Sequence, residues 1–169
     1  MLMEIRTFLV GLIGFFILMS CEKEPPRLPE ETQQGKGTFG CLVNGELVIQ
    51  EDQTGIFRPR KPYGIRNAEG QFMLIAEVEY GHKFEFFISY PELGHCVIDS
   101  VFFWVASKPH YYAARNVQQI NFTKFDGIAS GTFTFDADCY DERTHTLIPN
   151  QKIHVNKGRF DVLVETHWF

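Results

Sequence analysis

The sequence predicts an all-β protein: a single antiparallel β-sandwich or barrel-like meander domain behind a signal peptide and a flexible tether. Three observations predict this class. Apolar and polar residues alternate along several short runs, turn-forming pairs with glycine or asparagine join neighbouring runs, and no run after residue 38 repeats with a helical period. About 130 residues follow residue 37, a length that suits one domain, residues 38–169.

The N-terminal residues have the composition of a secretory signal peptide. The run from Phe8 to Met19 contains no charged residue, and Arg6 precedes it. A helix of that length covers about 18 Å, well short of the roughly 30 Å of a bilayer core. A basic start, a short apolar centre and a small residue at the exit are typical of a cleaved leader. We therefore expect residues 1–20 to be removed.

The exit of the apolar run, Leu18-Met19-Ser20-Cys21, resembles the bacterial lipobox. The resemblance implies cleavage after Ser20, a diacylglycerol thioether on Cys21, and acylation of the new α-amine with a chain such as palmitate. Each buried CH₂ contributes about 0.8 kcal/mol, so two or three chains anchor a protein firmly. We therefore expect a membrane as partner and the cell envelope as location, at the outer membrane and on the cell surface. A plain signal peptide or an uncleaved anchor, with an incidental cysteine, is the alternative.

Residues 21–37 are expected to form the lipidated cysteine and a disordered tether. The segment holds three prolines, many charges and one aliphatic residue, so it buries too little apolar surface to order itself. We expect it to add no stability to the domain. Glu22 and Glu24 resemble the signal that sends some Bacteroidetes-type lipoproteins to the cell surface, and mere solubility is the alternative.

Two hairpins are predicted in the first half of the domain. Residues 41–49 read CLVNGELVI, with Asn44-Gly45 as a type I′ turn between two short strands. Residues 71–90 alternate, turn at Gly81-His82 and alternate back. The apolar side of this second hairpin holds Phe72, Leu74, Ala76, Val78, Tyr80, Phe84, Phe86, Ile88 and Tyr90.

Two further strands are predicted near the C-terminus. In the run GTFTFDADC, Phe133 and Phe135 fall on one side, and Thr132 and Thr134 fall on the other. We expect the two phenylalanines to be buried and the two threonines to be more exposed. At most one turn of helix is expected, near residues 111–116. The last strand alternates with Phe160, Val162, Val164 and Trp168 on one side.

Three segments resemble an uncharacterised family of small Bacteroidetes-type lipoproteins: GTFGCLVNGELV (37–48), ASGTFTFDA (129–137) and KGRFDVLVE (157–165). Members of that family carry a TFGC-x-VNG segment after the tether, and GTF-F and GRFDV strands near the end. The resemblance implies the location and the all-β fold. It implies no activity, so no catalytic residue is carried over.

Composition and spacing argue against several function classes. The formal net charge of −5 argues against a nucleic-acid partner. The six histidines form no HxH or HExxH spacing, so no metal site is expected, and no cofactor or catalytic group is indicated.

Besides Cys21 the chain has Cys41, Cys96 and Cys139. These three either form one disulfide, by a pairing that the sequence leaves open, or are buried as small hydrophobes.

A basic stretch is one candidate for ligand contact. Arg58, Arg60 and Lys61, with Tyr63 as a stacking face, could meet an anionic surface glycan or lipopolysaccharide. A polar surface loop is the alternative. In addition, the run Asp99-Ser100-Val101 resembles the O-glycosylation acceptor of exported Bacteroidetes proteins, and the resemblance implies a glycan on Ser100.

Aromatic residues are the other candidate. Trp104, Tyr111 and Tyr112 fit the row of Trp and Tyr that carbohydrate-binding modules present on a sheet, and core packing is the alternative. The sequence therefore predicts a bacterial envelope lipoprotein that serves as a non-enzymatic, surface-exposed binding or accessory module for a glycan or an envelope protein. A lipocalin-like carrier of an apolar ligand, with a Phe-lined interior, is the alternative. A hydrolytic enzyme comes third, since no convergent polar motif supports it.

Overall fold

The computed structural model describes residues 27–50, 61–78 and 81–166, the side chains of Asn116 and Gln118 excepted. The predicted leader with Leu18 and Ser20, the lipidation residue Cys21, and Arg58 and Arg60 lie outside the described residues. Strands dominate the part that is described, which confirms the all-β class. That part contains no helix long and apolar enough to cross a membrane.

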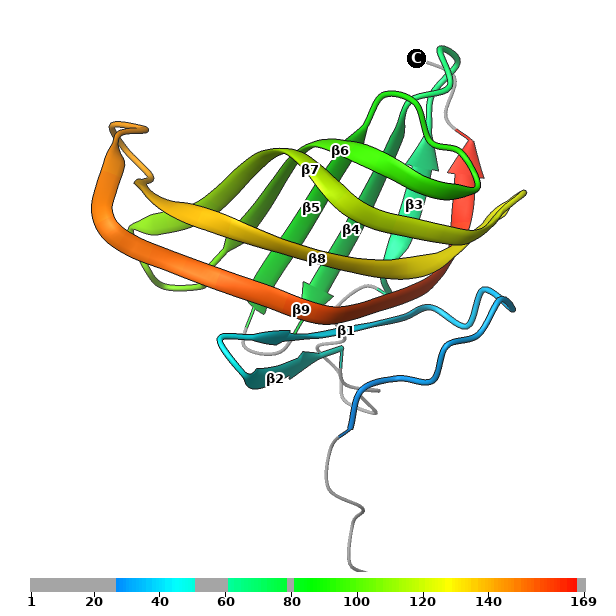
Figure 1. Cartoon of the computed structure of the whole chain (residues 1–169), viewed down its shortest axis with the longest axis horizontal. Coiled ribbons are helices and arrows are strands. Elements are labelled where there is room, and N and C mark those ends of the chain that lie inside the picture. Colours follow the sequence, from blue (N-terminus) through cyan, green and yellow to red (C-terminus); the bar gives the residue numbers. More distant parts are fainter. Residues whose placement is uncertain (1–26, 51–60, 79–80, 167–169) are drawn as a thin grey trace, which may run out of the picture.

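Nine strands build the described domain, and the last four are the longest (Figure 1). In chain order they are β1 (Thr38–Val43), β2 (Glu46–Ile49), β3 (Tyr63–Arg66), β4 (Phe72–Val78), β5 (His82–Ile88), β6 (Gly94–Trp104), β7 (His110–Phe125), β8 (Ile128–Asp141) and β9 (Leu147–Thr166).

All nine strands belong to one sheet, which closes on itself through β9. The order is β2-β1-β9-β3-β4-β5-β6-β7-β8, and β8 pairs with β9 as well. Closure is possible because β9 is long: one edge pairs with β8, while the other edge pairs first with β1 and then with β3. The β3–β9 pair is parallel, and the other pairs are antiparallel. The fold is therefore a barrel-like ring of strands β3 to β9, with the β1–β2 hairpin added to β9.

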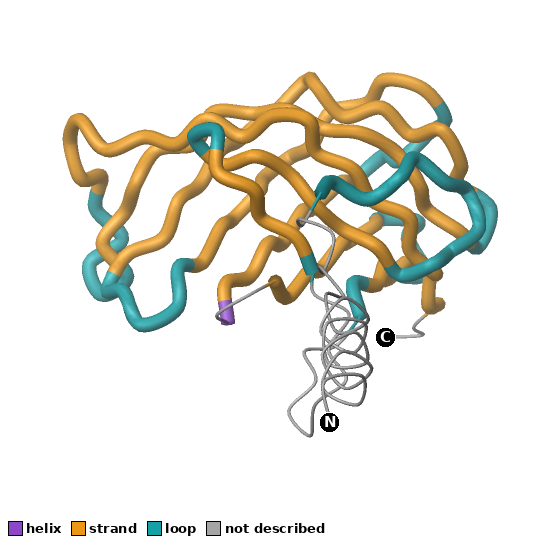
Figure 2. Tube along the Cα trace, turned by 90° about the horizontal axis from the view of Figure 1, so that it is seen from below, coloured by secondary structure: helices purple, strands orange, loops and turns teal. Residues whose placement is uncertain are grey.

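Aromatic rings fill the space inside the ring. The bent strands β7, β8 and β9 cross over β3, β4 and β5, and Figure 2 shows the same arrangement from below. Ring centroids of Phe84 and Phe103 lie 4.3 Å apart, and Phe133 of β8 lies 5.4 Å from Phe39 and 5.0 Å from Phe86. Full burial of one such side chain contributes roughly 1.5–3 kcal/mol, so these rings dominate the stability of the domain.

The predicted alternation and turns are confirmed where they are described. Phe133 and Phe135 are buried, whereas Thr132 and Thr134 are partly exposed. Asn44 has φ 51° and Gly45 has φ 88°, the two positive values that a type I′ turn requires. The second hairpin, β4–β5, is also present.

Two expectations, for residues 111–116 and for Tyr90, are wrong. The predicted helical turn near residues 111–116 is absent, because this stretch belongs to β7 and pairs with β6 on one side. Its alanines favour helix locally, but pairing across strands overrides that preference. Tyr90 is not part of the buried series either: β5 ends at Ile88, and Tyr90 is 88% exposed in the turn that follows.

Residues 27–37, which we call the strap, pack against the sheet. Arg159 of β9 donates a hydrogen bond to the carbonyl oxygen of Pro29, with an N–O distance of 3.0 Å, and forms an ion pair with Glu31. The backbone N–H of Gly37 donates to the carbonyl oxygen of Asp161. The expectation that disorder extends to Gly37 is therefore wrong for the strap, because groups of β9 satisfy polar atoms that the segment cannot satisfy itself. The rest of the expected tether, residues 21–26, lies outside the described residues.

Candidate functional site

The sheet has two outer faces of opposite chemistry. Residues paired across antiparallel strands point to the same side of a sheet, so the register assigns each side chain to the inside or the outside. The outside of β8 and β9, which we call the polar face, carries Thr132, Thr134, Asp136, Asp138, Lys152, His154 and Arg159. The outside of β3 to β6, which we call the apolar face, carries Tyr63, Ile65, Met73, Ile75, Phe87, Phe102 and Trp104. A solvated sheet face is normally polar, so the apolar face is the part of the surface that calls for a functional explanation.

An aromatic row runs along the apolar face and on to β8. It consists of Phe87, Phe102, Trp104, Tyr111 and Tyr140, one or two residues from each of β5 to β8. Successive ring centroids lie 6.0, 6.3, 4.7 and 5.7 Å apart in that order. Phe87 is 36% exposed, and Phe102, Trp104 and Tyr140 are half-buried. The row therefore offers ring faces to a ligand at several points.

Trp104 is held in place by a polar pair beside it. The indole N–H of Trp104 donates to Glu85 Oε2 with an N–O distance of 3.3 Å, and Lys83 Nζ lies 2.6 Å from Glu85 Oε1. The hydrogen bond to Glu85 raises the pKa of Lys83, against an opposing effect of burial. Since Glu85 is bound on both oxygens, the indole ring has a fixed orientation on the sheet.

A pocket of about 380 Å³ opens next to the aromatic row, and we call it the first pocket. Phe87 belongs to both the row and the pocket, and Ile65 and Met73 add to its apolar floor. Its rim is polar, with Asn67, Gln71, Ser89, Asp99 and Ser100.

Hydrogen bonds hold the rim of the first pocket in position. The Asn67 amide donates to Gln71 Oε1 at 2.8 Å, and the Gln71 backbone N–H donates back to Asn67 Oδ1 at 2.9 Å. On the opposite side, the Ser89 backbone N–H donates to Asp99 Oδ2. An apolar floor with a few oriented polar groups at the rim is typical of a small-ligand site.

The structure brings together some of the residues predicted to contact a ligand and separates others. Trp104 lies on the apolar face, and Tyr111, its cross-strand partner on β7, packs beside it and is only 7% exposed. Tyr112 points the other way, into the interior, where its ring stacks on Phe103. Tyr112 was therefore wrongly placed in the aromatic row, because neighbouring strand residues alternate between the two sides. The other members of the row, Phe87, Phe102 and Tyr140, were not predicted from the sequence.

Two other predicted residues line pockets on the apolar face. Lys61 and Tyr63 line a second pocket, of about 610 Å³, that shares Ile65 with the first. Ser100 lies within β6 and lines the first pocket, paired with Phe87 on one side and Arg115 on the other. O-glycosylation of Ser100 stays a prediction, and a glycan there would occupy the first pocket.

The polar face also has shallow pockets, of about 380 and 300 Å³, which share Gln119 and Thr134. Most charged groups near them are already paired within the protein. His154 Nδ1 lies 2.6 Å from Asp136 Oδ1, Lys152 Nζ lies 3.0 Å from Asp138 Oδ1, and Arg159 pairs with Glu31. These charged groups of the polar face therefore already have partners within the protein.

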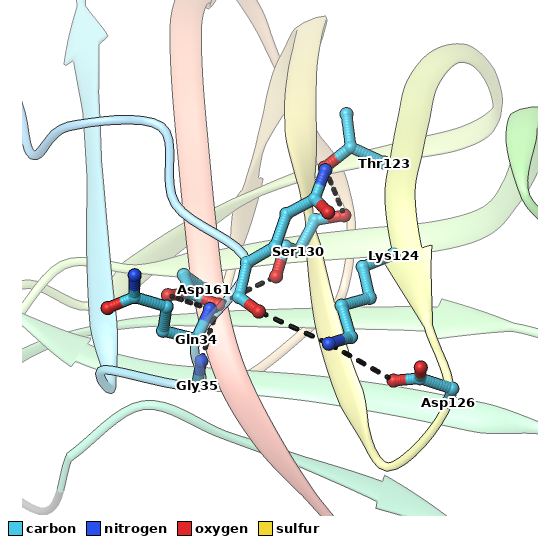
Figure 3. A network of polar contacts seen from close by, with 8 residues as sticks. Gln34, Gly35, Thr123, Lys124, Asp126, Ser130 and Asp161 are labelled. Carbon is cyan, nitrogen blue, oxygen red and sulfur yellow. Dashed lines mark hydrogen bonds and ion pairs between the residues drawn. The ribbon is translucent and has the colours of Figure 1, made fainter.

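Asp161 is a buried carboxylate that sequence analysis missed. It is 1% exposed and accepts hydrogen bonds from the Ser130 hydroxyl at 2.6 Å, from the Gly35 backbone N–H at 2.9 Å, and from the Thr32 hydroxyl. Backbone N–H groups of Gln34 and Lys36 add two more bonds, each 3.2 Å long. Figure 3 shows this arrangement, with donors from the strap and from β8 meeting the carboxylate of β9. Alternation along β9 places Asp161 on the outside, and only the strap makes it buried.

Hydrogen bonding to Asp161 outweighs the effect of its burial. Burial alone would raise the pKa of this carboxyl, because it disfavours the charged form. The hydroxyls of Ser130 and Thr32 and the N–H groups of Gly35 and Lys36 stabilise the charged form and lower the pKa to about 2. Asp161 is thus charged at neutral pH and clamps the strap to the sheet.

The three thiols of the described domain are buried, and the same part of the chain has no metal-ligating cluster. Cys41, Cys96 and Cys139 are free and buried, and burial raises the pKa of Cys41 to about 12, so this thiol is unreactive at neutral pH. Within the described ranges no group of three His, Cys, Asp or Glu side chains could hold a metal ion.

Comparisons of the chain with protein-family models, with curated proteins and with solved structures found no match.

Proposed function

We propose that this chain is a non-enzymatic binding module of a bacterial cell envelope, and that it binds carbohydrate on its apolar face. The observation that carries the proposal is the partly exposed aromatic row beside the first pocket, with a rim of amide, hydroxyl and carboxylate groups. Sugar rings have C–H faces that pack on aromatic rings and hydroxyl groups that need hydrogen-bond partners. The aromatic row supplies the first kind of contact and the pocket rim supplies the second.

The packing of the interior favours a sugar bound on the outer face over an apolar ligand bound inside the ring of strands. Aromatic side chains occupy the space inside the ring of strands in the described domain, and the centroids of neighbouring rings lie 4.3–6.4 Å apart. The lipocalin-like carrier would need that space to be open. A ligand on the outer face needs no rearrangement of the core.

Glycan binding by the purified chain and two variants tests this proposal. Trp104→Ala should weaken binding of a panel oligosaccharide at least tenfold in isothermal titration calorimetry, because the ring it removes is the largest in the row. Thr134→Ala, on the polar face, is the matched control and should bind as the wild type does. Equal weakening by both variants, or no binding of any glycan by the wild type, would overturn the proposal.

The location is part of the same proposal. Lipidation of Cys21 would hold the module at a membrane surface, in agreement with the lipobox resemblance and with the short apolar run before it. Cys21→Ala should abolish incorporation of labelled palmitate and release the chain to the soluble fraction or leave it uncleaved. Replacement of Glu22 and Glu24 by alanine should keep the lipid and reduce access of added protease to the domain on intact cells. Palmitate labelling of the Cys21 variant at the wild-type level would rule out this anchor.

A further inference from the structure

The second pocket has one wall that the strap builds. Gly35, Lys36 and Gly37 of the strap line it together with residues of β3 and β9 and the two residues before β3, among them Lys61, Pro62, Tyr63, Leu163 and Glu165. It shares Ile65 with the first pocket, so the two pockets adjoin on the apolar face. A ligand seated in the first pocket can therefore extend into the second.

The clamp on Asp161 fixes this wall. The N–H groups of Gly35 and Lys36 both donate to the Asp161 carboxylate, which sets the path of the turn. Gly35 and Gly37 have φ values of 66° and 71°, which favour glycine. A Cβ atom on Gly35 would lie 2.7 Å from Leu163 Cδ2, and one on Gly37 would lie 3.1 Å from Lys61 Cδ, so the turn packs closely against Leu163 and Lys61.

Two ammonium groups at this pocket are available to a ligand. Lys36 and Lys61 are both exposed, and within the described residues neither forms an ion pair. Three other lysines, Lys83, Lys124 and Lys152, each pair with a carboxylate. Among the described residues that line this pocket, Glu165 is the one acidic residue. The balance of charge at the pocket is therefore positive, although the whole chain carries a formal net charge of −5.

We propose that the second pocket binds the anionic group of an acidic glycan whose sugar ring lies in the first pocket. This inference rests on the proposed carbohydrate binding and narrows the ligand to sugars with a negatively charged substituent. Lys36 and Lys61 contact the anion, Tyr63 gives a ring face beside them, and Asp161 positions Lys36 through the strap. In a chain of net negative charge, these two lysines overcome the general repulsion of an acidic ligand only at short range.

The test compares a polyuronate oligosaccharide with the same oligosaccharide after reduction of its carboxyl groups to alcohols. The full chain in detergent should bind the acidic form about tenfold more tightly at low salt, and the preference should shrink as salt is added. The double variant Lys36→Ala/Lys61→Ala should keep the wild-type affinity for the reduced form and bind the acidic form no more tightly than the reduced form. Lys36→Arg/Lys61→Arg should keep the preference, and Lys108→Ala, an exposed lysine in the turn after β6, should not change it.

The outcomes separate this inference from the proposed function. A double alanine variant that still prefers the acidic form would overturn the inference and leave carbohydrate binding intact. Equal affinity of the wild type for the acidic and the reduced oligosaccharide would also overturn the inference and leave carbohydrate binding intact. Wild-type binding of polyacrylate as tight as that of the acidic oligosaccharide would also overturn it, since the pocket would then attract any polyanion. Absence of binding to either oligosaccharide, together with no effect of Trp104→Ala on any glycan, would remove the proposed function itself.

Discussion

Along β8 the outward positions hold Thr132, Thr134 and Asp136, whereas along β5 and β6 they hold Phe87, Phe102 and Trp104. Strand β8 and strands β5 and β6 all pack their inward phenylalanines into the same core, and along each of them inward and outward residues alternate with a period of two. Alternation therefore explains the inner side of each layer but not the difference between the outer sides. The packing of the core does not require the outer sides of the sheet to differ. Binding of a ligand is a sufficient physical reason for the apolar outer side of β5 and β6.

The strap adds a second contrast between the two faces. On the polar side of the molecule, Asp161 is outward and yet buried, because a segment distant in sequence covers it and satisfies its oxygens. On the apolar face, Phe87 remains 36% exposed. Asp161 is thus a polar outward group that is covered and hydrogen-bonded, whereas Phe87 is an apolar outward group that is available to a ligand. The predictions below test this distinction in order of decreasing effect.

The largest effect is expected where the inner and outer positions of one strand are compared. Phe135→Ala should lower the free energy of unfolding by about 3–5 kcal/mol, because it leaves a cavity among packed rings. Thr134→Ala, one residue away on the polar face, should cost less than about 1 kcal/mol. Urea unfolding of the domain measures both, and equal costs would contradict the assignment of inner and outer sides.

Removal of the strap should have the next largest effect. A chain that begins at Gly37 loses the donors from Thr32, Gln34, Gly35 and Lys36, and hydrogen bonds to a charged group contribute about 1.5–3 kcal/mol. We expect its melting temperature to fall by about 10 °C relative to a chain that begins at Arg27. A chain that begins at Glu22 should have the same melting temperature as the chain that begins at Arg27. Equal melting of all three would show that the strap adds no stability, as the sequence alone suggested.

Asp161→Asn tests the clamp without removing the strap. The folded-state pKa of about 2 lies below the ordinary value of 3.8, so the ionised carboxylate stabilises the fold at neutral pH by about 2 kcal/mol. The contribution is complete above about pH 4 and is lost as the pH falls through about 2. The variant should lose about 2 kcal/mol at pH 7 and show a smaller loss of stability between pH 4 and pH 2.

Asp136→Asn is the matched control for the clamp. Asp136 lies on the same side of the sheet, but its side chain is 77% exposed, and an exposed ion pair contributes less than about 1 kcal/mol. Its unfolding curves should follow the wild type at every pH from 2 to 7. A pH dependence of Asp161→Asn identical to that of the wild type would show that Asp161 is not the group that titrates.

Sequence alone gave the all-β class, the turn at Asn44-Gly45 and the burial of Phe133 and Phe135, because these depend on local pattern. It did not give the closure of the ring, because the parallel pairing of β3 with β9 joins residues a hundred positions apart. It missed Asp161 for the same reason: the donors that make this carboxylate buried come from the strap, at the other end of the chain. It named Trp104 and Lys61 but placed Tyr112 on the wrong side, because a helical turn was expected at residues 111–116, where neighbouring residues of β7 alternate between the two sides of the sheet.

The smallest effect on stability is expected on the apolar face itself. Phe87→Thr keeps a residue that favours strands and removes a ring that is 36% exposed, so it should change the free energy of unfolding by about 1 kcal/mol or less. The same change should lower the fluorescence of a bound hydrophobic dye and reduce self-association at high concentration, because it interrupts the aromatic row. Thr134→Phe, the reverse change on the polar face, should raise both signals. If Phe87→Thr destabilised the domain as much as Phe135→Ala does, Phe87 would be part of the core, and the contrast between an exposed apolar face and a solvated polar face would no longer hold.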